Sequence, residues 1–223
     1  MILCVSGEGP LRAALVAGFH EQGEDARVAS VSDDDLFGKA LGCRAMVYLP
    51  APTLLEGRLH PEPAPERMRK VLGATNAPGI ELLIVATPSG YEEEELALRK
   101  YGVPYVIMRT PPLVEELEAQ PALHERCAVW LPRGRKVAVT SAPRVAEAMV
   151  RASRDDSLQG ATVDAPSELV DAADVLRRAA ARARRASVHT VAPALDTMVR
   201  RVGRLFRVPE PAIVALHGQL ATG

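Results

Sequence analysis

Two hydrophobic patterns alternate along the first half of the chain. Short runs are apolar at every position, and the stretches between them repeat apolar residues at the spacing of an amphipathic helix. Leu11, Leu15 and Phe19 show this helical spacing, and Gly23 follows as a stop signal. The predicted strands cover residues 2–5, 26–31, 45–49, 80–87 and 103–108, and the predicted helices cover residues 11–22, 34–41, 66–74 and 92–101.

Strands that are apolar on both faces and alternate with helices indicate a parallel sheet covered on both sides. The connections between the predicted strands are too long for hairpins, which also favours parallel pairing. The sequence therefore predicts an α/β fold.

The pattern changes after Arg109. Residues 110–133 are punctuated by prolines and give no clear period. Further on we predict strands over residues 136–140 and 160–164, and helices over 142–152, from the cap Ser167 to about residue 185, and over 195–206. We expect one domain over residues 1–170 and an arginine-rich helical extension over residues 171–223.

Composition narrows the class of protein. The chain has 223 residues, is 48% hydrophobic and 25% charged, and can build a real core. Its net charge of -1 gives no general attraction to nucleic acid or anionic membranes. No apolar run reaches the ~18 residues of a membrane span, and the N-terminus lacks the pattern of a secretory signal. We expect a cytoplasmic protein.

The cysteines and histidines do not suggest a metal site. Cys4, Cys43 and Cys127 lie far apart without a C-x-x-C pair, which favours buried thiols in a reducing compartment. The five histidines show no paired ligand spacing. We therefore expect no metal.

The stretch CVSGEGPLRAAL begins like a phosphate-binding turn. An apolar strand meets Gly7 and Gly9 and then a helix, but Arg12 stands where G-x-G-x-x-G has its third glycine. The alternative is a tight turn that binds nothing. Arg12 either obstructs a degenerate turn, as we favour, or contacts a phosphate. Arg12→Gly would then create NAD affinity in the first case and weaken it in the second.

Three further stretches complete a resemblance that begins with ILCVSGEGPLRAAL. They are LALRKYGVPYVIMRTPPLVEEL, KVAVTSAPRVAEAMVRA and GATVDA. Together they resemble the atypical short-chain dehydrogenase/reductase superfamily, especially its NmrA-like, NAD(P)-sensing branch, over roughly residues 1–170. The resemblance implies a Rossmann-like doubly wound parallel sheet with a small C-terminal helical portion, and a ligand crevice at the carboxyl ends of the strands. We expect the strand order 3-2-1-4-5, with Cys4 buried at the centre.

The end of the second predicted strand bears on cofactor choice. NADP-preferring relatives often place a basic residue near Ser32, but here three aspartates follow it. They would repel a 2′-phosphate, whereas an NAD ribose can donate its 2′-OH to Asp33. Alternatively, Asp33 or Asp34 caps the next helix. NAD is thus expected over NADP, if a dinucleotide binds. The candidate cofactor-binding residues are Gly7, Gly9, Arg12, Ser32, Asp33, Pro50, Thr87 and Arg109.

The resemblance does not extend to catalysis. Active members of the superfamily use a Tyr-x-x-x-Lys pair, and this chain contains none. The register of the family helix places Thr87 at the tyrosine position and Tyr91 at the lysine position. Ser89 resembles a remnant of the active-site serine. Tyr91 and Ser89 are therefore the only catalytic candidates.

These observations favour a non-catalytic or weakly active NAD(P)-binding-like protein, a pseudoenzyme that acts as a nucleotide sensor or a regulatory interaction module. The alternative is an NAD-dependent reductase or epimerase. Arg109 follows the fifth strand, where it either lines the crevice mouth or pairs with Glu115 or Glu116.

The last quarter of the chain is cationic. Nine arginines and a single acid, Asp196, lie between Arg177 and Arg207. This stretch is either a docking surface for an acidic protein or a solvated helix face. Phe206 is its one aromatic residue, which argues against binding of single-stranded nucleic acid, and we expect nucleic acid less than an acidic protein as the partner. The sequence leaves open whether the chain forms a homo-oligomer.

Overall fold

The computed structural model describes residues 1–50, 54–55, 58–59, 64–88, 92–118, 128–132, 134, 136–183 and 187–191. The chain divides into two compact units, of which the first comprises Met1–Pro111 and Ala142–Pro166 and the second Pro112–Ser141 and Ser167–Gly223. The units thus group residues 112–141 with the C-terminal part of the chain, unlike the continuous division expected at residue 170. That domain boundary stays a prediction.

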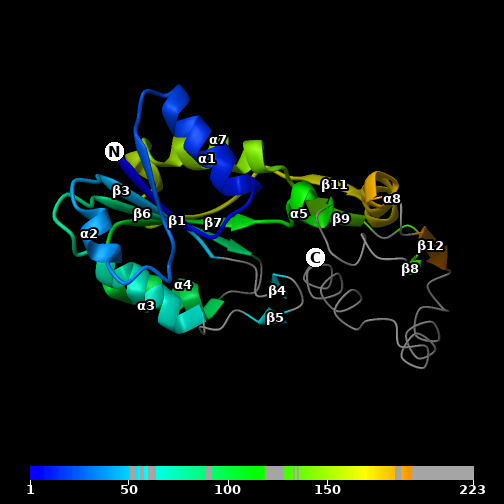
Figure 1. Ribbon diagram of the computed structural model, residues 1–223, viewed down its shortest axis with the longest axis horizontal. Helices are drawn as coiled ribbons and strands as arrows, with labels where there is room; N and C mark the ends of the chain where they lie inside the picture. The colour runs from blue at the N-terminus through cyan, green and yellow to red at the C-terminus, as the bar shows by residue number, and fades with distance from the viewer. Residues whose placement is uncertain are drawn as a thin grey trace. The chain divides into compact units, whose positions relative to one another are not determined.

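The first unit contains a six-stranded parallel sheet (Figure 1). Its strands are β1 Ile2–Ser6, β2 Ala26–Ala29, β3 Ala45–Leu49, β6 Leu82–Pro88, β7 Tyr105–Thr110 and β10 Thr162–Asp164. Their order in the sheet is β10-β7-β6-β3-β1-β2, and every neighbouring pair is parallel. The doubly wound, Rossmann-like α/β fold is therefore confirmed.

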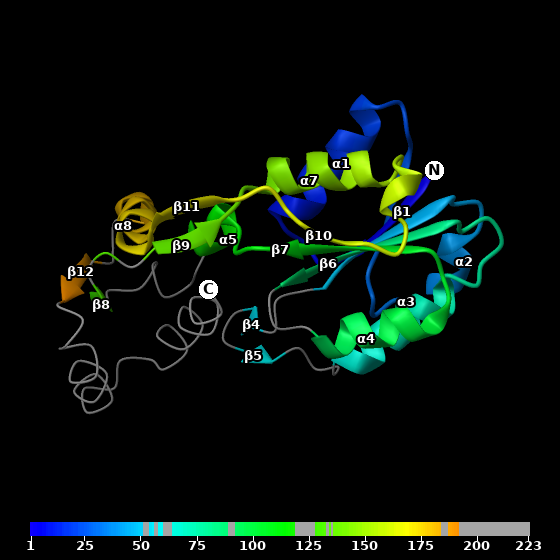
Figure 2. The same ribbon diagram turned by 180° about the vertical axis from the view of Figure 1, so that it is seen from behind.

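Helices cover both faces of this sheet (Figures 1 and 2). They are α1 Pro10–Glu21, α2 Leu36–Ala40, α3 Ala64–Ala74, α4 Glu92–Tyr101 and α7 Ala142–Ala152, with a short 3-10 helix η1 at Asp156–Leu158. Helices α1 and α7 pack together on one face, and α2, α3 and α4 lie on the other. A two-stranded antiparallel pair, β4 Leu54–Leu55 and β5 Arg58–Leu59, lies in the connection after β3.

The expected strand order 3-2-1-4-5 is wrong, because the third strand lies inside the sheet and the second lies at its edge. The side chains explain the difference. All five residues of β3 are buried, as a strand between two neighbours requires. Strand β2 includes Arg27 and is mostly only half-buried, which suits an edge.

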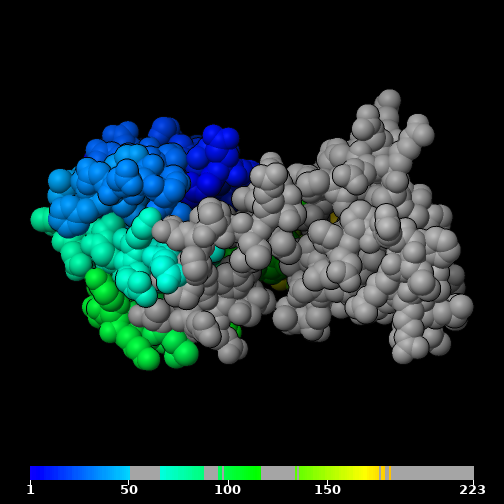
Figure 3. Space-filling view, turned by 60° about the horizontal axis from the view of Figure 1, so that its bottom comes forward, coloured from blue at the N-terminus to red at the C-terminus, as the bar shows by residue number. Residues whose placement is uncertain are grey.

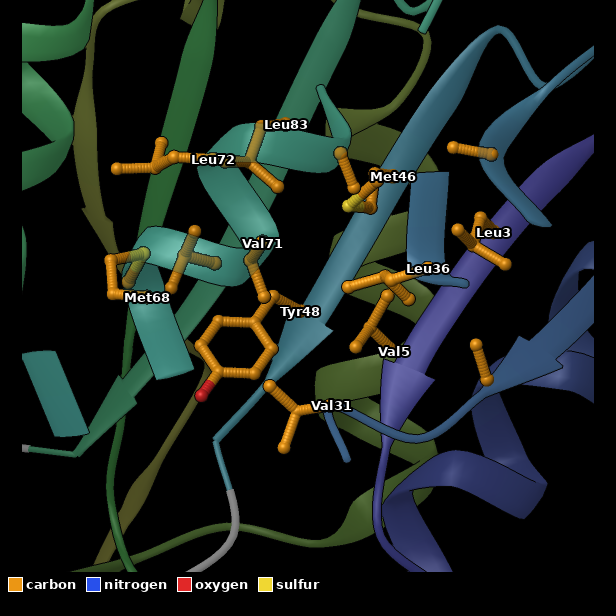
Figure 4. Close-up of a cluster of buried hydrophobic side chains, with 14 of the residues drawn as sticks. Leu3, Val5, Val31, Leu36, Met46, Tyr48, Met68, Val71, Leu72 and Leu83 are labelled. Carbon is orange, nitrogen blue, oxygen red and sulfur yellow. The ribbon is translucent and has the colours of Figure 1, made fainter. Parts of the chain in front are cut away.

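One hydrophobic cluster lies between the sheet and helices α2, α3 and α4 (Figure 4). Leu3 and Val5 from β1 meet Met46 and Tyr48 from β3 there, and α3 adds Met68, Val71 and Leu72. Cys4 is fully buried, as expected, but its strand β1 lies next to the edge strand β2 and not at the centre of the sheet. In the space-filling view, residues 1–50 and the α3 region lie next to one another on the surface of this unit (Figure 3).

The second unit differs more from the sequence prediction. Its elements are α5 Val114–Glu118, β8 Ala128–Pro132, β9 Lys136–Val139, β11 Glu168–Asp171, α8 Ala172–Ala183 and β12 Ser187–Val191. The helix expected to begin at Ser167 begins at Ala172, because β11 pairs antiparallel with β9. Asp171, not Ser167, accepts a hydrogen bond from the first turn, at Ala173 N. Strand β12 pairs with β8 where no strand was expected.

The helix expected over residues 195–206 lies outside the described residues. Among the residues that the structure describes, no helix combines the length and the apolar character that crossing a lipid bilayer requires.

Candidate functional site

The order of the strands creates a switch point between β1 and β3. The chain leaves β1 toward β2 on one side and continues from β3 toward β6 on the other. In open parallel sheets, ligands bind outside the carboxyl ends of the strands at such a point. Ser6 pairs in register with Leu49, so Gly7 and Pro50 both follow at this edge. The structure thus brings together the turn after β1 and the start of the connection after β3.

The glycine turn after β1 is open. Gly9 is extended, with φ 167° and ψ 170°, and neither Gly7 nor Gly9 has a φ in the left-handed range. A Cβ added at either would meet no protein atom within 4 Å. Neither the turn nor packing against the protein therefore demands glycine at these two positions. Because glycine has no side chain, the space beside the backbone stays free at both positions, and a phosphate needs this space in order to approach the backbone.

Helix α1 begins at this turn without a side-chain cap. Gly9 is its N-cap, Pro10 is its first residue, and no acidic residue lies in its first turn. By contrast, the side chain of Asp35 caps α2. The uncapped N–H groups and the positive end of the helix dipole favour an anion at α1.

Arg12 lies beside this turn and pairs with its exposed residue Glu8. The Nη2 atom of Arg12 is 3.6 Å from Oε1 of Glu8, and the side chain of Glu8 is 94% exposed. A phosphate bound by Arg12 would compete with this pair. Both alternatives for Arg12, obstruction and phosphate contact, stay predictions.

Four buried side-chain atoms in the described part of the chain have no hydrogen-bond partner: Ser6 Oγ, Glu66 Oε2, Arg67 Nε and Arg67 Nη1. Ser6 ends β1, and the other two residues lie in the first turns of α3, which follows β3. All four atoms therefore belong to segments at the carboxyl edge. Buried polar groups are nearly always paired with protein, ordered water or a ligand, so the partners of these four atoms lie outside the protein itself.

Sequence reasoning missed Arg67. A signal was present, since Arg67 is followed at helical spacing by Val71 and Ala74, which are apolar. An arginine in line with the apolar positions of a helix indicates a buried charge rather than a solvated one.

The end of β2 differs in detail from the expected ribose site. Asp33 pairs with Lys39, at 2.6 Å, and accepts a 2.8 Å hydrogen bond from Ser30 N. The hydrogen bond from Lys39 and that from Ser30 lower the pKa of Asp33. The cap of α2 was expected at Asp33 or Asp34, but it is Asp35. The Asp35 side chain accepts a hydrogen bond from Gly38 N, and α2 begins at the next residue.

This pairing removes part of the expected repulsion of a 2′-phosphate. A cation, Lys39, directly neutralises Asp33. Ser32 is exposed beside them, and its Oγ is 2.7 Å from that of Ser30. In the folded chain the three aspartates therefore do not all stand as unpaired negative charges.

A second polar cluster joins the ends of β6 and β7. Glu95 on α4 is buried and accepts hydrogen bonds from Arg109 Nε at 3.1 Å and Nη2 at 2.9 Å. Thr87 Oγ1 donates to Glu95 Oε1 at 3.3 Å. The Arg109 hydrogen bonds, together with its charge and the Thr87 hydroxyl, lower the pKa of Glu95. The carboxylate is thus held ionised between two neighbouring strand ends.

This cluster accounts for two predicted site residues. Thr87 lies opposite Arg109 in the β6–β7 register and is buried. Its hydroxyl donates to Glu95, and an aliphatic alcohol is a much weaker acid than the phenol of a tyrosine. That Thr87 stands at the tyrosine position stays a prediction. Arg109 pairs with Glu95, whereas the sequence predicted Glu115 or Glu116 as its partner. The catalytic candidates Ser89 and Tyr91 lie outside the described residues.

The remaining expectations concern metals and the arginine-rich segment. Within the described ranges, no three histidine, cysteine or acidic side chains converge as a metal site would need. In α8, Arg177 pairs with Asp174 at 2.8 Å and Arg178 is exposed. The docking surface for an acidic protein stays a proposal.

Solved structures share this fold. An epimerase of nucleoside-diphosphate sugars from Staphylococcus aureus is 11% identical, with a TM-score of 0.64, over 93% of this chain and 84% of its own. A short-chain dehydrogenase/reductase superfamily protein from Agrobacterium tumefaciens, solved with NAD, is 17% identical to this chain, with a TM-score of 0.62. The match covers 86% of this chain and 85% of that protein. Triphenylmethane reductase from Citrobacter sp., solved with NADP(H), is 15% identical to this chain, with a TM-score of 0.65. The match covers 100% of this chain and 90% of the reductase.

No protein-family model matches the chain, and no curated protein matches it in sequence. The resemblance seen in the sequence is therefore borne out at the level of the fold. The chain has the Rossmann-like fold of short-chain dehydrogenase/reductase proteins and nucleoside-diphosphate-sugar epimerases.

Proposed function

We propose that the chain binds a nicotinamide dinucleotide at the β1/β3 switch point and acts as a nucleotide sensor or regulatory module. The observation that supports binding is the open, uncapped glycine turn at the head of α1, where Gly7 and Gly9 keep free space beside the backbone. The pyrophosphate would lie against this helix N-terminus. Gly7, Gly9 and Ser6 would hold it.

The same site lacks the usual means of hydride transfer. The chain has no Tyr-x-x-x-Lys pair, and Thr87 donates its hydroxyl to Glu95 in a buried cluster. Glu95 in turn is held by Arg109, so its carboxylate is ionised and paired rather than free to act as a base. The described residues thus support binding better than turnover.

A reductase or epimerase is the second candidate. It is supported by the names of structural neighbours, which include nucleoside-diphosphate-sugar epimerases and a reductase. In that case the bound nicotinamide would supply or accept a hydride, and Tyr91 or Ser89 would have to move the proton.

Thermal unfolding with NAD, NADH, NADP, NADPH or no ligand tests binding. A ligand that binds only the native state stabilises it by about 2.7 kcal/mol at a concentration about 100 times its Kd. We expect at least one dinucleotide to raise the melting temperature. Incubation of the complex with nucleotide sugars and with carbonyl substrates should then leave the nicotinamide absorbance unchanged, whereas steady oxidation or reduction would favour the second candidate.

Gly9→Val provides the matched control. Because a Cβ at Gly9 meets no protein atom within 4 Å, the variant should fold and melt like the parent without ligand. Its side chain would fill the space that the phosphate needs, so the dinucleotide-induced shift should disappear. No shift with any of the four dinucleotides in the parent chain would refute the proposed function.

A further inference from the structure

The outer side of β2 has no neighbouring strand. In the classic Rossmann order a third strand covers the second one, but here β3 lies between β1 and β6, and β2 ends the sheet. The connection from β2 to β3 is fully described and contains α2 but no further strand. The fold thus leaves open an edge of the sheet that the classic order covers.

The backbone groups of Ala26 and Val28 point toward this open side. The carbonyl of Asp25 accepts a 2.8 Å hydrogen bond from Ile2 N of β1, so the N–H and C=O of Arg27 face β1 as well. Those of Ala26 and Val28 alternate with them and face outward. Within the described part of the chain, these outward groups make no hydrogen bond.

The usual means of protecting an edge strand are missing from β2. Its sequence is ARVA, without proline or lysine, and it pairs with β1 residue by residue without a bulge. Its one charge, on Arg27, is held toward α2, because Arg27 Nη1 donates a 2.7 Å hydrogen bond to the carbonyl of Lys39. An open edge of this kind is a template for pairing with another strand.

Exposed apolar side chains gather around the same edge. Among the described residues, seven large apolar side chains are exposed, and four of them lie on or next to β2 and α2: Met1, Val28, Phe37 and Leu41. Phe37 and Leu41 are one helical turn apart, and a Cβ at Gly42 would lie 3.9 Å from Met1 Cε. Apolar surface concentrated in this way marks an interaction site.

Charges and occupied backbone groups select one way in which two copies of β2 can pair. In an antiparallel pair, residues that face outward must lie opposite one another. Pairing around Val28 would need the N–H and C=O of Ser30, but Ser30 N donates to the Asp33 side chain and Ser30 O accepts from Asp33 N. Pairing around Arg27 would place it opposite the same arginine of the second copy. Pairing around Ala26 meets neither obstacle.

We propose that two copies of the chain form a homodimer through antiparallel pairing of β2 around Ala26. Ala26 of each copy exchanges both of its backbone hydrogen bonds with Ala26 of the other, and Asp25 of each lies opposite Arg27 of the other. Asp25 is exposed, and Arg27 Nε and Nη2 make no hydrogen bond within the described residues, so these opposite charges pair across the contact.

This contact is self-complementary, as a two-fold interface requires. It joins the sheets of the two copies into one, and it covers the apolar side chains beside the edge, including Phe37 and Leu41. The second copy thus supplies the strand that the classic order has outside β2. The inference goes beyond the proposed function and does not depend on nucleotide binding.

Analytical ultracentrifugation of the parent chain, Leu41→Asp and Leu96→Asp tests the interface. At about 100 µM the parent should sediment with twice the mass of one chain. Leu41→Asp should raise the dissociation constant by about tenfold or more, since it places two charges in the apolar contact. Leu96→Asp is the matched control, because Leu96 is 54% exposed on α4 of the same unit, and it should leave the dimer unchanged.

Ala26→Cys tests the register. Opposite Cα atoms of a hydrogen-bonded antiparallel pair are about 5.5 Å apart, which a disulfide can span. Under mild oxidation with diamide, this variant should form a disulfide between two chains, visible on a non-reducing gel. Val28→Cys should not, because two Val28 residues are about 14 Å apart in this register. The parent chain, with its three native cysteines, is the blank.

A parent chain that stays monomeric at this concentration overturns the inference. A dimer that Leu41→Asp leaves intact also overturns it, because the contact then lies elsewhere on the surface. Crosslinking of Val28→Cys as complete as that of Ala26→Cys contradicts the proposed register.

Discussion

At the scale of the residue, two buried charges at the carboxyl edge behave differently. Glu95 is satisfied by Thr87 and Arg109. Arg67 has two donors without partners. A satisfied buried charge contributes to the stability of the native state, whereas an unsatisfied one lowers it and points to something that binds there. The contrast separates a structural cluster from a candidate ligand site.

Glu95→Gln should lower the free energy of unfolding by about 1–3 kcal/mol at pH 7, because Arg109 and Thr87 lose a charged acceptor. Arg109 is about half exposed, which limits the loss. The folded pKa of Glu95 lies below its ordinary value of 4.5, so its stabilisation is present above that pH and is lost as the pH falls through the folded pKa. Urea unfolding from pH 7 to pH 3 should show the two proteins converging in stability.

The exposed pair on α7 serves as the control for this experiment. Glu147 pairs with Arg151 at 2.8 Å, and both side chains are mostly exposed. Glu147→Gln should change the unfolding free energy by less than about 1 kcal/mol. An equal loss in both variants would mean that the buried cluster has no special role.

The structure gives the positions of the described candidate residues, whereas their roles stay predictions. The candidates Gly7, Gly9 and Pro50 follow the carboxyl ends of β1 and β3, and Thr87 and Arg109 are the penultimate residues of β6 and β7. Their partners could not be predicted, because the Glu95–Arg109 contact depends on how α4 packs on β6 and β7. Arg67 was missed because the periodicity of an isolated helix does not say which polar residue lacks a partner.

At the scale of the element, apolar periodicity located the helices and strands well. The bounds of β3, α4 and α7 agree with the sequence prediction. The order of the strands could not be predicted from this periodicity, because periodicity shows which face of a strand is buried but not which strands lie next to it. The apolar content of each strand held that information: β3 is AMVYL, wholly buried, whereas β2 is ARVA and lies at the edge.

Two glycines inside helices should respond oppositely to added side chains. In α1, a Cβ at Gly18 would lie 3.3 Å from Val150 Cγ2 on α7, so Gly18→Val should overpack this helix pair. We expect it to lower the unfolding free energy by about 1–3 kcal/mol.

In α3, a Cβ at Gly73 meets nothing within 4 Å. Gly73→Ala should therefore raise the unfolding free energy by about 0.5–1 kcal/mol through helix propensity. Denaturant unfolding of both variants checks the pair of predictions. Similar effects of the two substitutions would contradict the close packing of α1 on α7.

At the scale of the whole molecule, β1 is an interior strand of the six-stranded sheet, next to the edge strand β2. It pairs with β2 on one side and β3 on the other, and Ile2, Leu3, Cys4 and Val5 are fully buried. Interior strands become exposed only when the whole cooperative unit unfolds. The Cys4 thiol therefore reports on the global stability of this unit.

Burial, aided by the nearby Cys43, raises the pKa of Cys4 to about 12. Near neutral pH the thiol is thus both inaccessible and protonated, and the thiolate is the reactive form. Alkylation of Cys4, followed by mass spectrometry of its peptide, should be negligible in the folded protein and complete in denaturant. A bound dinucleotide should slow it further. Rapid labelling under native conditions would show that the sheet opens locally.

The discontinuity of the first unit has a consequence for its synthesis. Residues 142–166 supply α7, which packs on α1, and β10, which pairs with β7. On the ribosome, the sheet edge at β7 and the apolar face of α1 with Leu15 and Phe19 emerge before these covering segments. At about 5–20 residues per second, the delay between residues 111 and 166 lasts about 3–11 seconds. During that interval the nascent chain exposes surface that chaperones bind, so its yield in a cell depends on translation speed and on chaperone supply.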